Sequence, residues 1–211
     1  MKKPRTLLAD DHSMFTEGLR IILEPEVDLV AIVDDGRALL KAVDEHQPDI
    51  VITDLTMPSL NGIDAAEQIR KQHPRVKIIV LTMHADVAFA EAAFRAGASA
   101  YVVKRSGATE LIAAIKEVRR GNSYLTPAVT EDVLTFLVDR VPSNRAPGLS
   151  PRQREVLQLI AEGARTKDIA EALHISPRTV EAHRYAIMQE LDAHTTAELT
   201  RFAIRHGIVS E

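Results

Sequence analysis

The chain of 211 residues is first constrained by what it lacks. It has no cysteine, which excludes disulfides, thiolate metal sites and a cysteine nucleophile. No apolar run approaches the length of a membrane span, and the short run after the basic N-terminus is no signal peptide. No Gly-x-x-x-x-Gly-Lys loop for nucleotide phosphates occurs. With a net charge of −4 there is no basic excess, so any nucleic-acid surface must be a local patch. These absences favour a cytoplasmic protein without a membrane partner.

Apolar segments alternate with amphipathic segments over about the first 120 residues. Each apolar segment is short enough for a strand, and each amphipathic one carries the apolar spacing of a helix. Ser13 and Thr166 are expected to cap helices, and Asp35-Gly36 to form a turn before a helix at 38–46. The helix after Ser13 is expected to carry Ile22 on its apolar stripe. The alternation predicts an α/β fold, a five-stranded parallel doubly wound sheet with helices on both faces. The expected strands are 6–9, 29–33, 49–54, 76–81 and 98–103.

Residues 49–54 form the segment around which this half is organised. The run is apolar and β-branched, as in a strand buried on both faces, and ends at Asp54. Right-handed crossovers bring the carboxyl ends of parallel strands to one edge, where open sheets place their chemistry. The polar residues expected at that edge are Asp10, Asp11, Asp54, Thr82 and Lys104.

Three carboxylates that converge at one edge repel one another unless a cation holds them. Mg²⁺ suits carboxylate and phosphate oxygens. A carboxylate can also act as a nucleophile and form an acyl phosphate, while a lysine and a hydroxyl neutralise and position the phosphoryl group. Taken singly, each residue is more simply a loop, cap or surface residue. Their joint occurrence at strand ends favours a site that holds a phosphoryl group.

Residues 5–120 resemble the receiver domain of two-component response regulators, which has a flavodoxin-like fold. The motifs that carry this resemblance are Ala9-Asp10-Asp11-His12, Asp54-Leu55-Thr56-Met57-Pro58, Asn61-Gly62, Leu81-Thr82 and Tyr101-Val102-Val103-Lys104.

The resemblance implies a role for each matching residue. Asp54 is the phosphate acceptor, and Mg²⁺ is held by Asp11, by Asp10 through a water, by Asp54 and by the carbonyl of Thr56. Lys104 pairs with the phosphoryl group, and Thr82 and Tyr101 move together as the switch. Many receivers have proline after this lysine; here Arg105 follows, which leaves open whether the peptide bond is cis.

The second half of the chain differs in character. A short amphipathic helix with Val129, Val133 and Leu137 is expected, followed by a linker rich in proline and polar residues at 139–148. The expected division is a receiver at 1–121, a helix and linker at 122–147, and an all-α domain of four helices at 148–211.

The pattern of the last domain predicts a helix-turn-helix, in which Ser176-Pro177 opens the second helix. On that helix Val180, Ile187 and Leu191 face inward, and Arg178, Ala182, Tyr185 and Gln189 point away, with Glu181 beside them. From residue 146 onward there are 8 Lys/Arg against 9 Asp/Glu. Pattern alone therefore leaves a solvated helical bundle as open as a DNA-binding domain.

Residues 149–209 resemble the LuxR-type DNA-binding domain, and the order of the domains resembles the NarL/FixJ family. The motifs are Leu149-Ser150-Pro151-Arg152, Glu155-Val156-Leu157, Ile160-Ala161-Glu162-Gly163, Lys167-Asp168-Ile169-Ala170, Ile175-Ser176-Pro177-Arg178-Thr179-Val180, His183-Arg184 and Ala197-Glu198-Leu199.

This second resemblance implies how the domain meets DNA. Residues implied to face the major groove are Arg178, Glu181, Ala182 and Tyr185, and those implied to contact phosphates are Thr166, Lys167, Thr179 and Arg184. Glu181 stands where many members have lysine, which alters base readout; the alternative is that it pairs within its own helix with Arg178 or Arg184, each three residues away. Asp192 stands where many have glycine, at a helix end that can require a left-handed conformation.

The expected function is a transcription regulator, not an enzyme. A histidine kinase phosphorylates Asp54, and this controls homodimerisation and binding to promoter half-sites, arranged as an inverted repeat. Before phosphorylation the receiver is expected to mask the recognition helix or to hold the dimer apart. Two alternatives stay open: an enzyme that hydrolyses phosphate esters with the helical bundle as a lid, and a regulator that binds only a protein partner.

Overall fold

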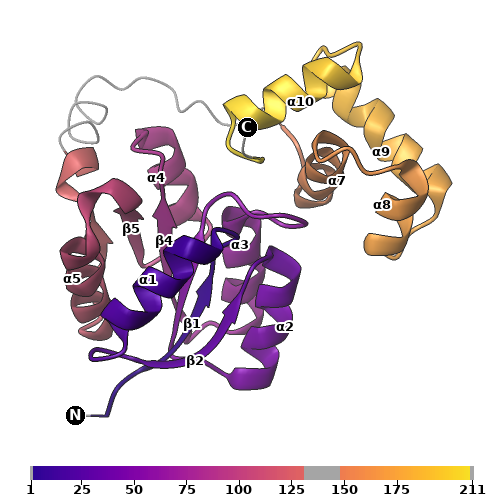
Figure 1. The fold of residues 1–211 in the computed structure, drawn as a ribbon. Helices are drawn as coiled ribbons and strands as arrows, with labels where there is room; N and C mark the ends of the chain where they lie inside the picture. The colour runs from indigo at the N-terminus through magenta and orange to yellow at the C-terminus, as the bar shows by residue number, and fades with distance from the viewer. Residues whose placement is uncertain (1, 131–147, 210–211) are drawn as a thin grey trace.

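The computed structural model describes residues 2–130 and 148–209. They form an α/β half and a helical half (Figure 1). The strands are β1 (Arg5–Ala9), β2 (Asp28–Val33), β3 (Ile50–Asp54), β4 (Lys77–Thr82), β5 (Ala100–Val103) and β6 (Tyr124–Leu125). The helices beside them are α1 (Ser13–Leu23), α2 (Gly36–His46), α3 (Gly62–Gln72), α4 (Val87–Arg95) and α5 (Ala108–Arg119). The helical half contains α7 (Pro151–Ala161), α8 (Thr166–Ala172), α9 (Pro177–Glu190) and α10 (Thr196–Arg205).

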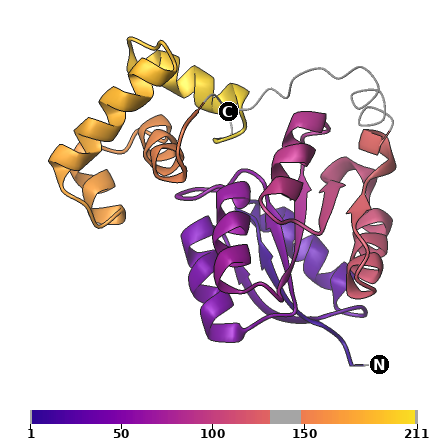
Figure 2. The same ribbon diagram turned by 180° about the vertical axis from the view of Figure 1, so that it is seen from behind.

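The sheet is parallel, with strand order β2-β1-β3-β4-β5-β6. Figure 2 shows the helices on its two faces, as a doubly wound fold requires. Leu19 of α1 and Ile115 of α5 pack on one face, and Leu39 of α2 and Ile69 of α3 on the other. The expected class of fold is confirmed. It has one strand more than expected, because Tyr124–Leu125 pairs with β5 instead of leading directly into a helix.

Four predictions about the helices are wrong: the start of α2, the caps of α1 and α8, and the burial of one side chain of α1. Gly36 begins α2, because the carboxylate of Asp35 accepts hydrogen bonds from the amides of Arg37 and Ala38. Ser13 and Thr166 are the first residues of their helices and not their caps. Ile22, expected on the apolar stripe of α1, is exposed.

The caps of the helical half follow the sequence more closely. Ser150 and Thr195 each form a capping box with the third residue of the helix that follows. Asp192 has φ of 49°, which confirms the left-handed conformation expected at the end of α9. A separate core holds the four helices together, with Val156, Leu157, Val180, Ile187 and Leu199 at its centre.

The expected central helix and linker extend beyond the described residues. Val133, Leu137 and the linker up to residue 147 lie outside the described residues. Val129 is described and is fully buried against the receiver core. Among the residues that are described, no helix is both long enough and apolar enough to cross a membrane.

Candidate functional sites

The carboxyl ends of three strands bring the expected acidic residues and the lysine together. Asp10 and Asp11 follow β1, Asp54 ends the adjacent strand β3, and Lys104 follows β5. Because β4 lies between β3 and β5, the long side chain of Lys104 has to reach across it. The peptide bond after Lys104 is trans, since no cis bond occurs among the described residues.

Lys104 bridges two buried carboxylates. Its Nζ lies 2.7 Å from Oδ2 of Asp54 and 2.7 Å from Oδ2 of Asp10. The side chains of all three residues are at most 6% exposed. Such pairing is what makes two buried acids tolerable, since an unpaired buried charge is strongly destabilising. The ring of Phe15 lies 4.8 Å from the ammonium and covers it.

The protonation of Asp54 reflects its burial. Loss of solvent raises the pKa of this carboxyl to about 6, an effect that Asp10 increases and the Lys104 ammonium opposes. The carboxylate is therefore mainly ionised at neutral pH, as a nucleophile requires. One oxygen accepts a hydrogen bond from the amide of Leu55 at 2.7 Å, and the other faces Lys104.

The acidic cluster has the donors that a hard divalent cation prefers. Ligand atoms of Asp10, Asp11, His12 and Asp54 all lie within 4.8 Å of one another. Oδ2 of Asp10 is buried, and the partner it has among the described residues is the Lys104 ammonium at 2.7 Å, an ion pair without hydrogen-bond geometry. The carbonyl of Thr56 is without a hydrogen-bond donor among them. These oxygens fit Mg²⁺ in both number and chemistry.

His12 was not assigned a role from sequence, yet it belongs to this cluster. Its Nδ1 lies 2.8 Å from Asp11 and 3.0 Å from Asp10. The signal in the sequence was a histidine directly after two acids. The orientation of its side chain depends on the turn that follows β1, which the sequence does not specify. The imidazole adds one nitrogen ligand atom beside three carboxylates.

Thr82 and Tyr101, the expected switch pair, are linked through one residue. The hydroxyl of Tyr101 donates to the carbonyl of His84 at 2.9 Å, and the amide of His84 donates to Oγ1 of Thr82 at 3.2 Å. Both side chains are almost fully buried, and burial raises the pKa of Tyr101 well above its usual range. The ring of His84 packs in turn on Phe89 of α4. The pair is therefore coupled to α4 through the backbone and ring of His84.

The second expected site lies on α9. Val180 and Ile187 are buried, whereas Arg178, Ala182 and Tyr185 are exposed, as the helical wheel predicts. The phosphate-contact candidate Thr179 is also exposed at the helix start, and Lys167 is exposed on α8. The helix-turn-helix therefore offers a polar face to a ligand.

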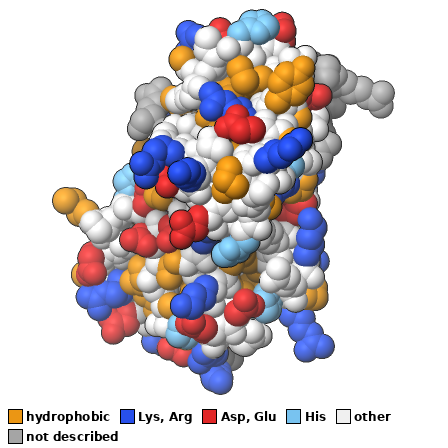
Figure 3. All heavy atoms as spheres, turned by 90° about the vertical axis from the view of Figure 1, so that its right-hand side faces the viewer, with side chains coloured by type: hydrophobic (Ala, Val, Ile, Leu, Met, Phe, Trp, Pro, Cys, Tyr) orange, Lys and Arg blue, Asp and Glu red, His pale blue; other side chains and the backbone are white. Residues whose placement is uncertain are grey.

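Glu181 has a partner that the sequence did not indicate. Its Oε1 accepts a hydrogen bond of 2.8 Å from the hydroxyl of Thr166, at the start of α8. Arg184 instead donates to Thr196 at 2.7 Å, so the pairing of Glu181 with a neighbouring arginine of α9 is not formed. The surface shown in Figure 3 carries acidic and basic side chains interspersed, without a continuous basic face.

The receiver meets the helical half through α7, and also at Gly207 after α10, but not through the recognition helix. Gln158 of α7 is fully buried; its amide donates to the carbonyl of Met57 at 2.8 Å, and its oxygen accepts from the amide of Asn61 at 2.8 Å. These two partners lie in the loop that directly follows Asp54. The expectation that the receiver masks α9 is therefore wrong for this structure, because the exposed face of α9 is uncovered.

An ion pair adds to this contact. Arg154 of α7 lies 2.8 Å from Asp64 and 3.1 Å from Glu67, both on α3. Burial raises the pKa of Asp64, and Arg154 opposes the shift. One signal in the sequence was missed: Gln158 is a polar residue inside the apolar run Val156-Leu157-Gln158-Leu159-Ile160. A buried glutamine needs partners, and here they come from the other domain.

Comparison with known families matches both halves of the chain. Residues 6–116 match the response regulator receiver domain, and residues 147–203 match the bacterial regulatory proteins of the luxR family. The transcriptional regulatory protein DegU of Brevibacillus brevis is 32% identical over 225 residues, which cover 98% of this chain and 95% of DegU. The oxygen regulatory protein NreC of Staphylococcus epidermidis (strain ATCC 12228) is 36% identical over 215 residues, covering 97% of this chain and 99% of NreC.

Solved structures agree with these matches. The response regulator RcsB of Salmonella typhimurium superposes with a TM-score of 0.66 at 28% identity, covering 96% of this chain and 97% of RcsB. A structure of two RcsB dimers bound to two parallel DNAs gives a TM-score of 0.60 at 27% identity, covering 95% and 98% of the two chains. The chain therefore belongs to the response regulators that join a receiver to a LuxR-type DNA-binding domain. It is a transcription regulator rather than an enzyme.

Proposed function

We propose that Asp54 accepts a phosphoryl group from a sensor histidine kinase and that this controls promoter binding. In this step an oxygen of Asp54 attacks the phosphorus, the bond to the donor imidazole breaks, and an acyl phosphate forms. The observation that carries the proposal is the pairing of the buried Asp54 with Lys104, at 2.7 Å, beside two further acids. Lys104 is already placed to neutralise a phosphoryl oxygen.

Mg²⁺ is the proposed cofactor of this step. Asp10, Asp11, Asp54 and the carbonyl of Thr56 would hold it, and the ion supplies charge neutralisation between the acids and the incoming phosphoryl group. Thr82 and Tyr101 are the proposed switch residues, because both hold His84 beside α4. Phosphorylation then alters the position of this segment.

The proposed target is double-stranded promoter DNA, bound by a homodimer at two half-sites of an inverted repeat. Arg178, Glu181, Ala182 and Tyr185 would meet the major groove. Thr166, Lys167, Thr179 and Arg184 would contact phosphates. Dimers bound to DNA, as described for RcsB, support this arrangement. We place the protein in the cytoplasm, where its DNA and the kinase domain are accessible. We propose domains at 1–121 and 148–211 joined by 122–147, with residues 124–129 of the joining segment packed on the receiver.

Titration of the full chain against duplex promoter DNA, with and without acetyl phosphate and Mg²⁺, tests the proposal. We expect the phosphodonor to tighten binding and Asp54→Asn to abolish that response. Sustained turnover of acetyl phosphate without any effect on DNA binding would instead indicate an enzyme. No binding of DNA in either state would indicate a regulator that acts only on proteins.

A further inference from the structure

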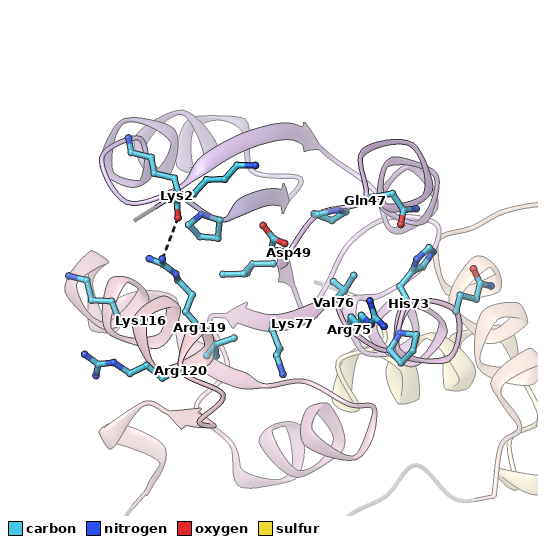
Figure 4. Close-up of a pocket in the computed structure, with 17 residues that line it drawn as sticks. Lys2, Gln47, Asp49, His73, Arg75, Val76, Lys77, Lys116, Arg119 and Arg120 are labelled. Atoms are coloured by element: carbon cyan, nitrogen blue, oxygen red, sulfur yellow. Dashed lines mark hydrogen bonds between the residues drawn. The ribbon is translucent and has the colours of Figure 1, made fainter.

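A second charged site lies at the opposite edge of the sheet from Asp54. It is a pocket of about 970 Å³ between the N-terminal segment, the C-terminal end of α5 and the start of β4 (Figure 4). Asp49 is the one acid in its lining. The basic residues that line it are Lys2, Lys3, Arg75, Lys77, Lys116, Arg119 and Arg120. This concentration of positive charge occurs in a chain whose net charge is −4.

Several of these cations have no acidic partner. Lys116 lies 3.4 Å from Glu26, and Arg120 lies 2.6 Å from Glu117. The side chains of Lys2, Arg75 and Lys77, by contrast, have no ion pair with any residue in the described parts of the chain. Arg119 donates only to the backbone carbonyl of Lys2, at 3.5 Å. Their charges repel one another and remain available to an anion.

Helix dipoles account for only part of the cluster. Arg119 and Arg120 lie at the C-terminal end of α5, where cations are favourable. Lys2 precedes β1, Arg75 lies in the turn after α3, and Lys77 begins β4. None of these three is at a helix end, so complementing the dipoles does not explain them.

The floor of the pocket is apolar and has a few polar groups at its margin. Pro4, Pro48 and Val76 are buried beneath the cations. The single acid, Asp49, is engaged by the amide of Arg5 at 2.8 Å. A concave apolar floor rimmed by polar groups, in this range of volume, can hold a small ligand.

We propose that this pocket binds a compact polyphosphate anion, either an inorganic one or the phosphate chain of a nucleotide. The cations surround one hollow instead of following a line, which suits a compact multivalent anion better than the extended backbone of DNA. The recognition helix α9 lies at the other end of the molecule (Figure 1), so this pocket and the DNA face are separate.

Calorimetric titration of the full chain with sodium triphosphate and with ATP, in buffer containing EDTA, tests the pocket. The chelator removes divalent cations that could bridge a phosphate to the acidic cluster around Asp54. We expect Lys77→Glu and Arg119→Glu each to weaken binding at least tenfold. Lys41→Glu makes the same change of charge on the exposed surface of α2 and should leave affinity within twofold. Circular dichroism verifies that each variant is folded.

Comparison of the two ligands identifies the source of the phosphate groups. Equal affinity for both ligands assigns the pocket to the polyphosphate group alone, and tighter binding of ATP assigns it to a nucleotide. The proposal is overturned if neither ligand binds, or if Arg178→Glu on the DNA face abolishes binding while Lys77→Glu does not. It is also overturned if Lys41→Glu weakens binding as much as the two pocket variants.

Discussion

A buried carboxylate that must act as a nucleophile meets two opposing demands. Burial removes water from Asp54 and raises its pKa to about 6, while the reaction requires the ionised form. Lys104 opposes the shift by its charge and hydrogen bond. The ionised carboxylate is therefore kept at neutral pH at a cost in stability, and that cost can be measured.

Asp54→Asn is expected to raise the free energy of unfolding in metal-free buffer at pH 7.5. The folded pKa of about 6 lies above the ordinary aspartate value of 3.8, so the folded state binds the proton more tightly. This group's contribution to stability is present below about pH 4 and is lost as the pH rises through 6. A difference of about two pKa units corresponds to at most about 3 kcal/mol. Urea unfolding followed by circular dichroism at pH 4.5 and 7.5 measures it.

Asp28→Asn is the matched control, because it removes an exposed carboxylate from the same domain. Its stability should follow that of the unaltered chain at both pH values. If the difference in free energy of unfolding between Asp54→Asn and the unaltered chain does not change with pH, the assigned pKa is contradicted. The same Asp54 variant should not be labelled by acetyl phosphate, whereas Asp28→Asn should be.

At the DNA face, Glu181 and Lys167 are expected to act differently. A carboxylate in the major groove can accept a hydrogen bond from the cytosine amino group. Glu181→Ala should therefore flatten the preference at one position per half-site by about 1–3 kcal/mol. Lys167→Ala should weaken all sequences together and lower the salt slope by about one unit. Selection of half-sites with both variants separates the two effects.

The base preference of the Glu181 variant decides its role. If that preference is unchanged, the carboxylate serves only to hold Thr166, from whose hydroxyl it accepts a hydrogen bond of 2.8 Å. Thr166→Val is then the informative comparison, since it removes the same hydrogen bond from the other side. A base-reading Glu181 should retain its preference in that variant.

Residues at strand ends were predictable, and residues whose partners come from elsewhere in space were not. Asp10, Asp54 and Lys104 could be brought together from sequence because parallel strands end at a common edge. The partner of Glu181 could not be chosen, since helix spacing offered only residues of its own helix. Gln158 was overlooked because its hydrogen-bond partners are about 100 positions earlier in the chain.

At the scale of elements, α7 is both a core helix and a docking helix. Val156 and Leu157 pack into the helical half, and Gln158 and Arg154 contact the receiver. The receiver loop that it meets is tightly built: a side chain at Gly62 would come within 1.9 Å of the carbonyl of Asp54. Gln158 contacts Met57, which is three residues after Asp54 in this loop. A structural change at Asp54 can therefore be transmitted to α7.

Gln158→Ala is therefore expected to increase the DNA affinity of the unphosphorylated chain severalfold. If the domains stayed docked, the carbonyl of Met57 and the amide of Asn61 would be buried without partners, at about 1–3 kcal/mol each. Separation of the domains relieves that cost. It also frees the helical halves of two chains to meet on DNA, which follows if the docked receiver holds the dimer apart. Fluorescence anisotropy with a labelled duplex measures the change.

Gln72→Ala is a suitable control, because this glutamine is exposed at the end of α3 and has no bond to α7. Its DNA affinity should equal that of the unaltered chain. Unchanged affinity in Gln158→Ala would mean that the docking of α7 does not restrain DNA binding.

The sequence predicted the strands and helices more accurately than the residues at which they begin and end. Strand and helix order came from the alternation of apolar periods, which tertiary packing preserves. The start of α2 differed because Asp35 acts as a cap two residues earlier than the turn signal suggested. The strand β6 was missed because two residues are too few to show an alternation, and its pairing depends on the neighbouring β5.

For the whole molecule, the same contact predicts how the isolated helical half behaves. A fragment that starts at Leu149 keeps a buried core residue and the Ser150 cap of α7. It should bind target DNA without a phosphodonor, and more tightly than the unphosphorylated full chain. Electrophoretic mobility shift with equal molar concentrations of both proteins tests this. Equal binding would mean that phosphorylation acts through dimerisation alone.

The short strand β6 determines where an isolated receiver domain has to end. Thr126, directly after it, accepts a hydrogen bond from the amide of Val103 at 3.1 Å, and Tyr124–Leu125 covers the outer side of β5. A receiver that ends at Gly121 would leave the apolar strand Ala100–Val103 as an open edge, which invites pairing with another copy. A receiver that ends at Thr130 keeps the edge closed. Sedimentation velocity should show self-association that grows with concentration for the first and a single monomeric species for the second.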